Sequence, residues 1–268
     1  MKKACSLILT VAMVMLLLAA ANSAVAGKAM DSILKKGELV VAITGTQPPL
    51  NAKDKTGKII GFDADIAELI AKNMNVKIKF STMPFPDLLP ALKAGKADMV
   101  ISGMTMTLER NLQSAFVGPY YISGKGILTK AASIGAMQQA EGLNNPDFKI
   151  AALENSTSLT FVERAAPKAK LVPTKSYDEA IEMLFQDKID ALVADYPYCA
   201  FTAFRYQDKG LVAGQSKFTI EPLGIAVHED TLLINWLQNF LTMLDASGQM
   251  KILNKKWFQD GSWIDQLP

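Results

Sequence analysis

The stretch from Ser102 to Arg110, SGMTMTLER, has the composition of an anion-binding loop. An arginine guanidinium can donate two parallel hydrogen bonds to one carboxylate. Thr105 adds a hydroxyl and a backbone N–H, and a short helix opening near Thr107 would favour the same anion at its N-terminus. We therefore predict that Arg110 and Thr105 bind a carboxylate; the alternative for Arg110 is a solvated surface position.

Asp195 ends a second apolar segment, IDALVAD. Its carboxylate suits an ammonium group, although a helix N-cap before Pro197 is an equally good interpretation. If Arg110 and Asp195 face each other across a cleft, the ligand that satisfies both is an α-amino acid, which carries a carboxylate and an ammonium.

Strand and helix patterns alternate along the chain and predict an α/β fold with mainly parallel sheets. The first unit contains expected strands at 38–43, 76–80 and 97–101, with helices at 65–73 and 86–93, and Asp63 as the expected N-cap of the first helix. The second contains expected strands at 149–152, 171–173 and 189–194, with helices at 158–165 and 177–186. Two amphipathic helices, 232–246 and 249–258, follow.

The two units share one local design. The segments 91–98 and 184–190 each precede a strand. Each contains the end of a helix, a tight basic turn, an apolar residue and an aspartate, in that order. The strands that follow lead to Ser102 and to Asp195. Ligands of open α/β sheets bind beyond the carboxyl ends of strands, so both positions are candidate site positions.

The first 26 residues have the three parts of a secretory signal peptide. Lys2 and Lys3 precede an apolar run at 7–21, and Ala24-Val25-Ala26 forms a small-residue cleavage site. A membrane anchor is the alternative, but the run is short for a span of about 20 residues. Cleavage would remove Cys5 and leave Cys199 without a disulfide partner, which favours a bacterial periplasmic protein.

The charge balance excludes some partners. Loss of two signal lysines takes 28 basic residues to 26, against 26 acidic ones, so the mature chain is close to neutral. Neutrality argues against nucleic acid and against an anionic membrane surface. We expect no catalytic residue, no metal and no cofactor, and the chain carries no P-loop pattern.

Several motifs occur in an order that resembles one family. They are Gly61-Phe-Asp-Ala-Asp65, Leu89-Pro-Ala-Leu92 with Ala97-Asp98, Ser102 to Arg110, Gly118-Pro-Tyr-Tyr121, Glu221-Pro-Leu-Gly-Ile-Ala226 and Lys256-Trp-Phe258. Together they resemble the family 3 extracellular solute-binding proteins, the periplasmic receptors of amino-acid ABC importers. The similarity runs from Lys36 to Phe258.

This resemblance implies a type II periplasmic binding protein fold, with a ligand cleft between two α/β lobes joined by two hinge strands. We expect lobe one at 27–119 and 224–268, lobe two at 125–218, and hinges at 120–124 and 219–223. Closure of the lobes on the ligand would be recognised by an inner-membrane permease, and we expect a monomer.

The resemblance also assigns candidate ligand contacts. The Arg110 position binds the α-carboxylate with help from Thr105, while the Gly103 carbonyl and Asp195 take the ammonium. Asn155-Ser156-Thr157 matches a Gly-Thr-Thr segment, so Ser156 and Thr157 are expected contacts and the Thr157 backbone caps the carboxylate. Asn155 replaces the usual glycine and tolerates positive φ. Phe85 is of a type found more often in a core, but its position matches a wall of the family's side-chain pocket, which favours the pocket.

Two positions depart from the family pattern. Thr44 stands where an acid often contacts a cationic side chain, and Gln47 stands where an aromatic ring often stacks on the ligand. A buried cation without a counter-charge costs several kcal/mol. We therefore expect a neutral polar or acidic amino acid rather than a basic one.

Two other functions stay open. Dehydratases that act on arogenate-like compounds share this architecture, with Glu154 as a conceivable general acid, although solvent exposure of Glu154 is expected. A free binding protein could also serve a membrane receptor. Of the remaining residues, we expect Cys199 and Met243 in the core, and Lys125 and His228 exposed, while Tyr198 could face either the cleft or solvent.

Overall fold

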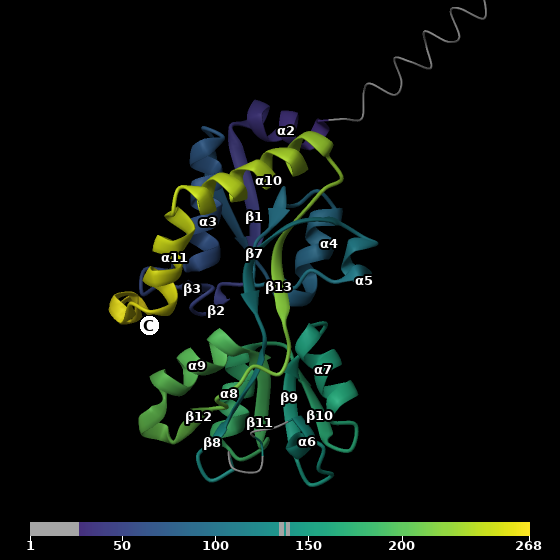
Figure 1. Cartoon of the computed structure of the whole chain (residues 1–268), viewed down its shortest axis with the longest axis vertical. Coiled ribbons are helices and arrows are strands. Elements are labelled where there is room, and N and C mark those ends of the chain that lie inside the picture. Colours follow the sequence, from purple (N-terminus) through teal and green to yellow (C-terminus); the bar gives the residue numbers. More distant parts are fainter. Residues whose placement is uncertain (1–26, 134–136, 138–139) are drawn as a thin grey trace, which may run out of the picture.

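The structure is a computed structural model that describes residues 27–133, 137 and 140–268. The predicted signal peptide lies outside these residues. The described chain forms two lobes, each built around its own five-stranded sheet (Figure 1).

The first lobe contains the sheet β5-β1-β6-β13-β7. Its first three strands are parallel, and β13 runs antiparallel to both β6 and β7. The strands are β1 (Glu38–Ile43), β5 (Lys77–Thr82), β6 (Met99–Val100), β7 (Ala115–Ser123) and β13 (Glu221–Val227). A small sheet beside it contains β2 (Thr46–Gln47), β3 (Asn51–Lys53) and β4 (Ile59–Ile60).

Helices cover both faces of the first sheet because its strands are apolar on both sides. One face packs in a large cluster that includes Leu39, Val41 and Ile225, and the other packs around Leu88 and Val100. The helices are α2 (Lys28–Lys36), α3 (Phe62–Asn73), α4 (Leu88–Lys93), α5 (Leu108–Asn111), α10 (Thr231–Ala246) and α11 (Gln249–Phe258), with 3-10 turns at Phe85–Asp87 and Gly261–Gln266.

The second lobe repeats this design with the sheet β10-β9-β11-β8-β12. Again three parallel strands are followed by an antiparallel pair. The strands are β8 (Lys125–Lys130), β9 (Lys149–Leu153), β10 (Lys170–Thr174), β11 (Ala191–Asp195) and β12 (Leu211–Ala213). The helices are α6 (Ala140–Leu143), α7 (Thr157–Ala165), α8 (Tyr177–Phe185) and α9 (Tyr196–Arg205), with a 3-10 turn at Gln207–Lys209.

Strands β7 and β13 lie side by side and lead from one lobe to the other (Figure 1). Near the crossing, Glu221 pairs with Ser123 and Leu223 pairs with Tyr121. Lys125 begins β8 two residues after β7 ends. The segments expected to form the hinges therefore contain the ends of two paired strands.

The two-lobe α/β fold confirms the predicted fold class, and the predicted repeat is present. In each sheet the first strand of the unit lies between the second and third. β6 leads to Ser102 and β11 ends at Asp195, so the two candidate positions stand at equivalent strand ends.

Three local predictions were wrong. Gly61, not Asp63, is the N-cap residue of α3, and the Asp63 carboxylate is buried among side chains. Met243 is 71 % exposed on α10 rather than in the core. Lys125 is fully buried rather than solvated, because two carboxylates surround its ammonium.

Candidate ligand-binding site

The loop from Ser102 to Arg110 folds so that Arg110 turns back over it. The Thr107 hydroxyl accepts the backbone N–H of Arg110 at 3.1 Å and so caps α5. The Arg110 guanidinium donates from Nη1 to the carbonyl of Thr105 at 2.8 Å. Helix α5 has only four residues, and the Arg110 N–H in its first turn is already bonded to the Thr107 hydroxyl.

Arg110 also reaches the second lobe. Its Nη2 donates to the carbonyl of Asn155 at 3.1 Å, and its guanidinium carbon lies 5.4 Å from the centre of the Phe85 ring. Burial lowers the pKa of Arg110, while the charges of Asp195 and Glu221 act in the opposite direction. The guanidinium stays charged, because arginine does not deprotonate in proteins.

The second-lobe side of the cleft is the turn that opens α7. Asn155 has φ of 56°, so it adopts the left-handed conformation that we expected at this position. The Ser156 hydroxyl caps α7 by accepting the N–H of Leu159 at 3.2 Å and donates to the carbonyl of Leu153 at 2.6 Å. Thr157 then begins the helix, and its Oγ1 lies 3.3 Å from Oγ1 of Thr105.

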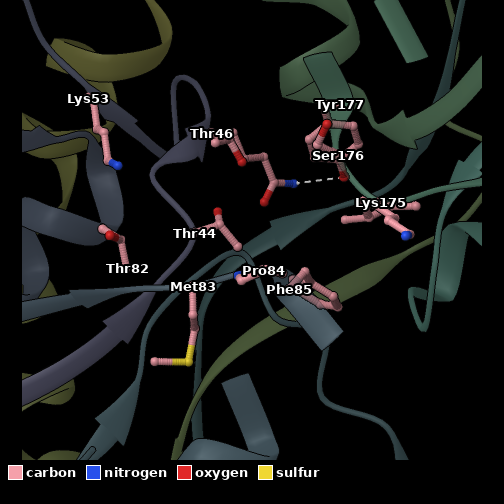
Figure 2. Close-up of a pocket in the computed structure, with 12 residues that line it drawn as sticks. Thr44, Thr46, Lys53, Thr82, Met83, Pro84, Phe85, Lys175, Ser176 and Tyr177 are labelled. Atoms are coloured by element: carbon pink, nitrogen blue, oxygen red, sulfur yellow. Dashed lines mark hydrogen bonds between the residues drawn. The ribbon is translucent and has the colours of Figure 1, made fainter. Parts of the chain in front are cut away.

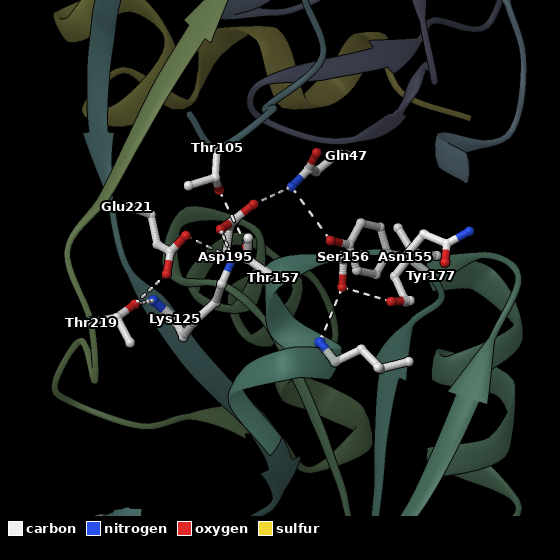
Figure 3. A network of polar contacts seen from close by, with 12 residues as sticks. Gln47, Thr105, Lys125, Asn155, Ser156, Thr157, Tyr177, Asp195, Thr219 and Glu221 are labelled. Atoms are coloured by element: carbon white, nitrogen blue, oxygen red, sulfur yellow. Dashed lines mark hydrogen bonds and ion pairs between the residues drawn. The ribbon is translucent and has the colours of Figure 1, made fainter. Parts of the chain in front are cut away.

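The Asp195 carboxylate does not cap the helix that follows it. Its Oδ2 accepts a hydrogen bond from Nε2 of Gln47, in the other lobe, at 2.7 Å. Its Oδ1 accepts one from Nζ of Lys125 at 2.9 Å. Asp195 is therefore a buried acid facing the cleft, and Figure 3 shows it between Gln47 and Lys125.

Lys125 and Glu221 belong to this site, and we did not predict either. The ammonium of Lys125 also lies 3.7 Å from Oε2 of Glu221, whose other oxygen accepts from the Thr219 hydroxyl at 2.9 Å (Figure 3). The only sequence signal was a lysine at the start of an otherwise apolar strand, KGILTK, next to a predicted hinge.

Two adjoining hollows, which share four lining residues, lie between the lobes. The smaller, about 10 Å³, lies among Gly103, Thr105, Arg110, Ser156, Thr157 and Asp195. The larger, about 260 Å³, is lined by Thr44, Thr46, Gln47, Lys53, Thr82, Met83, Pro84, Phe85, Leu153, Lys175, Ser176 and Tyr177 (Figure 2). Gln47, Phe85, Leu153 and Tyr177 line both.

Gly103 lies close beneath Gln47. It has φ of 58°, and a Cβ added to it would lie 2.6 Å from Oε1 of Gln47. A side chain at this position would therefore push Gln47 out of the cleft, which gives a physical reason for glycine here.

A buried polar network supports the first-lobe wall. Asn51 accepts from the Thr44 hydroxyl at 2.7 Å and donates to Asp63 at 2.8 Å. The Tyr120 hydroxyl donates to the other oxygen of Asp63 at 2.9 Å. Burial raises the pKa of Asp63 to about 7, against the opposing effect of these hydrogen bonds. The motif that starts at Gly61 thus holds the wall in place.

The structure brings all nine predicted site residues to the two hollows. Thr44 lines only the larger one, while Gln47 lines both and also bonds to Asp195 in the other lobe. Tyr198 is buried and stacks on Tyr177, with ring centres 4.2 Å apart, so neither of its two expected environments holds.

Other residues lie outside the cleft. Cys199 is buried, as expected. His228, which we expected to be exposed, is instead half-buried, with Nε2 3.4 Å from the carbonyl of Ala97. Glu154 is half-buried and lines neither hollow. In the described part of the chain, no group of three or more His, Cys, Asp or Glu side chains could hold a metal ion. None of the described helices has the length and apolar composition to cross a membrane.

Two α/β lobes that enclose buried charges of both signs define a ligand-binding protein of the two-lobe class. Residues 39–260 match the model of bacterial extracellular solute-binding proteins, family 3. The chain belongs to this family.

Three similar proteins illustrate the match. ABC transporter arginine-binding protein 1 of Escherichia coli is 30 % identical over 224 residues, covering 81 % of this chain and 88 % of that protein. A putative binding component of an ABC transporter from Wolinella succinogenes, solved with lysine, is 32 % identical with a TM-score of 0.82, covering 86 % and 99 %. The ancestral amino-acid-binding protein AncCDT-1, a precursor of cyclohexadienyl dehydratase, is 36 % identical with a TM-score of 0.79, covering 85 % and 99 %.

Proposed function

We propose that this protein captures a free α-amino acid between its lobes and delivers it to the permease of an ABC importer. The observation that carries the proposal is the pair Arg110 and Asp195, one from each lobe, both lining the same small hollow. The guanidinium suits the α-carboxylate, and the buried acid suits the α-ammonium.

The carboxylate end is built from both lobes. Arg110 and Thr105 come from the first lobe, and the N-terminal turn of α7 at Thr157 comes from the second. The lobes already meet here through the bond from Arg110 to Asn155. A ligand carboxylate placed among these groups would contact both lobes at once, so it would favour the closed arrangement over an open one.

The larger hollow would hold the side chain of the ligand. Among its described lining residues, Lys53 and Lys175 are the charged ones, and no aspartate or glutamate is present. A cationic side chain would enter this hollow without a counter-charge, whereas a neutral polar or acidic one would meet threonines, Gln47 and the two lysines. This supports a polar or acidic ligand, in contrast to the arginine and lysine named for two of the similar proteins.

Calorimetric titration against the twenty amino acids tests the proposal. We expect the tightest binding for a neutral polar or acidic amino acid, and weak binding of lysine and arginine. Tight lysine binding would refute the ligand class, and no binding of any amino acid would refute the function. Mass spectrometry of the ligand that co-purifies from cells gives an independent answer.

A dehydratase is the second candidate, because AncCDT-1 is described as a precursor of one. Such a reaction needs a general acid that reaches the substrate. Glu154, the acid considered from the sequence, lines neither hollow, and Asp195 and Glu221 are both held at Lys125. These contacts favour binding without turnover. Prolonged incubation with prephenate or arogenate should therefore leave both compounds intact.

Family membership supports export to the periplasm. The signal peptide itself remains a prediction from sequence. N-terminal sequencing of protein recovered from the periplasm would place the cleavage, which we expect after Ala26.

A further inference from the structure

Three buried charges form a cluster where the lobes join, which we call the charge triad: Lys125, Asp195 and Glu221. Lys125 is the first residue of β8, Asp195 the last of β11 and Glu221 the first of β13. Their exposed fractions are 2 %, 4 % and 8 %. Charged side chains are rarely buried to this extent unless they are paired, so the triad is a built feature of the fold.

The geometry holds the triad in place from several sides. Asp195 pairs with Lys125 in the antiparallel register of β11 and β8, and their side chains form the ion pair at 2.9 Å. Glu221 lies 3.7 Å from the same ammonium. The Thr219 hydroxyl donates to Glu221 and accepts the backbone N–H of Lys125, both at 2.9 Å. Lys125 is thus shared between two carboxylates.

The charge count at this end of the cleft follows from these contacts. Asp195 with Lys125 alone would be a neutral pair, with little net attraction for a ligand ammonium. Glu221 adds a second carboxylate, so the triad carries a net charge of −1 by the formal charges of its members. Arg110 carries +1 at the other end of the small hollow.

A free α-amino acid matches both ends of the cleft, since it carries one negative and one positive group. A 2-hydroxy or 2-oxo acid matches Arg110 but leaves the triad with its unbalanced charge. Electrostatic interactions are strong in a buried site, because little water screens them. Burial lowers the pKa of Arg110, and the charges of both Asp195 and Glu221 act to raise this pKa.

We propose that Glu221 and Lys125 are specificity-determining residues that fix the net charge of the ammonium subsite at −1, so that the site selects α-amino acids over the corresponding 2-hydroxy and 2-oxo acids. The proposal rests on the proposed function and deepens it. Glu221 acts through its charge and through its contact with Lys125. The residue that contacts the ligand ammonium is Asp195.

The test compares two ligands that differ only in the ammonium group. The tightest binder among the twenty L-amino acids is titrated beside its own L-2-hydroxy acid, and the ratio of the two Kd values is the readout. Glu221→Gln keeps the size of the side chain and removes one negative charge, so the preference for the amino acid should fall at least tenfold. Lys125→Gln removes the positive charge, so the preference should rise at least threefold.

The control is Glu229→Gln, an exposed glutamate just beyond the other end of β13, which should leave the ratio unchanged. If Glu221 has only a structural role, Glu221→Gln should weaken binding of both ligands equally. The ratio of their Kd values would then match that of the wild type, and this result would overturn the proposal. A wild-type protein that binds the two ligands equally well also overturns it. If Lys125→Gln does not fold, the ratio of Kd values measured for Glu221→Gln tests the proposal by itself. Wild-type binding of the 2-hydroxy acids but of no amino acid would instead overturn the proposed function.

Discussion

The guanidinium of Arg110 donates one hydrogen bond within its own lobe, to Thr105, and one across the cleft, to the carbonyl of Asn155 at 3.1 Å. One side chain therefore contributes both to the shape of the carboxylate subsite and to the contact between lobes. Its planar fork can form two bonds with fixed geometry, which an ammonium cannot reproduce.

Arg110→Lys should therefore weaken binding of the amino-acid ligand by about 10- to 100-fold, because a charge-assisted hydrogen bond contributes about 1.5–3 kcal/mol. Calorimetry on the variant and the wild type measures the change. The matched control is Arg164→Lys, an exposed position on α7, which should bind as the wild type does. Equal affinity of Arg110→Lys and the wild type would contradict the assignment of Arg110.

The Gln47 side chain joins the lobes at the other end of the cleft, through its 2.7 Å bond to Asp195. Gln47→Ala removes this charge-assisted bond, whose loss is worth about 1.5–3 kcal/mol, so the balance should shift toward the open arrangement. Small-angle scattering of the ligand-free protein should then give a larger radius of gyration than for the wild type.

Thr46→Ala is the control for Gln47→Ala, since Thr46 is an exposed neighbour on the same strand. It should leave the radius of gyration unchanged. If Gln47→Ala and Thr46→Ala give the same value, the contact between Gln47 and Asp195 does not hold the lobes together.

The raised pKa of Asp63 predicts that the free energy of unfolding falls as the pH rises. Burial raises its pKa from 3.8 to about 7, so the folded protein holds a proton that the unfolded chain releases. The contribution of Asp63 is fully present below the unfolded pKa and is lost as the pH rises through about 7. Between pH 5 and pH 8 the loss has an upper limit of about 3 kcal/mol.

Asp63→Asn isolates this effect, because an amide does not titrate. Urea unfolding of both proteins at pH 5 and pH 8 gives the free energies, and the wild-type protein should lose more stability over this interval than the variant. Asp31→Asn, at an exposed position on α2, should follow the wild type. Parallel pH profiles for the wild type and Asp63→Asn would contradict the raised pKa.

Local patterns were enough to predict much of the fold. The strand at Glu38–Ile43 has the predicted bounds because it is a short continuous apolar run, and the helix at Gln249–Phe258 has them because its apolar residues recur at helical spacing. The repeated design before Ser102 and Asp195 also indicated which strand ends meet at the cleft. These features depend on residues that are neighbours in sequence.

Features that depend on distant partners were missed. Nothing near Lys125 in sequence shows that Asp195 and Glu221 surround it, 70 and 96 residues away, so its local sequence predicts a surface residue. Asp63 has the spacing of a helix cap, yet Asn51 and Tyr120 take its oxygens inside the lobe. Met243 lies on an amphipathic helix whose buried face is set by the sheet that it covers.

The larger hollow gives the last prediction, on ligand choice. Lys175 lines it on the second-lobe side, and an acid at this position would give a cationic side chain the partner that the wild-type lining lacks. Lys175→Glu should therefore strengthen binding of lysine and arginine relative to glutamine by about tenfold, and weaken binding of glutamate, as measured by calorimetry with each of the four amino acids. The control is Lys170→Glu, which makes the same charge change at the exposed start of β10. If both variants shift the preference equally, the effect comes from the net charge of the protein and not from this hollow.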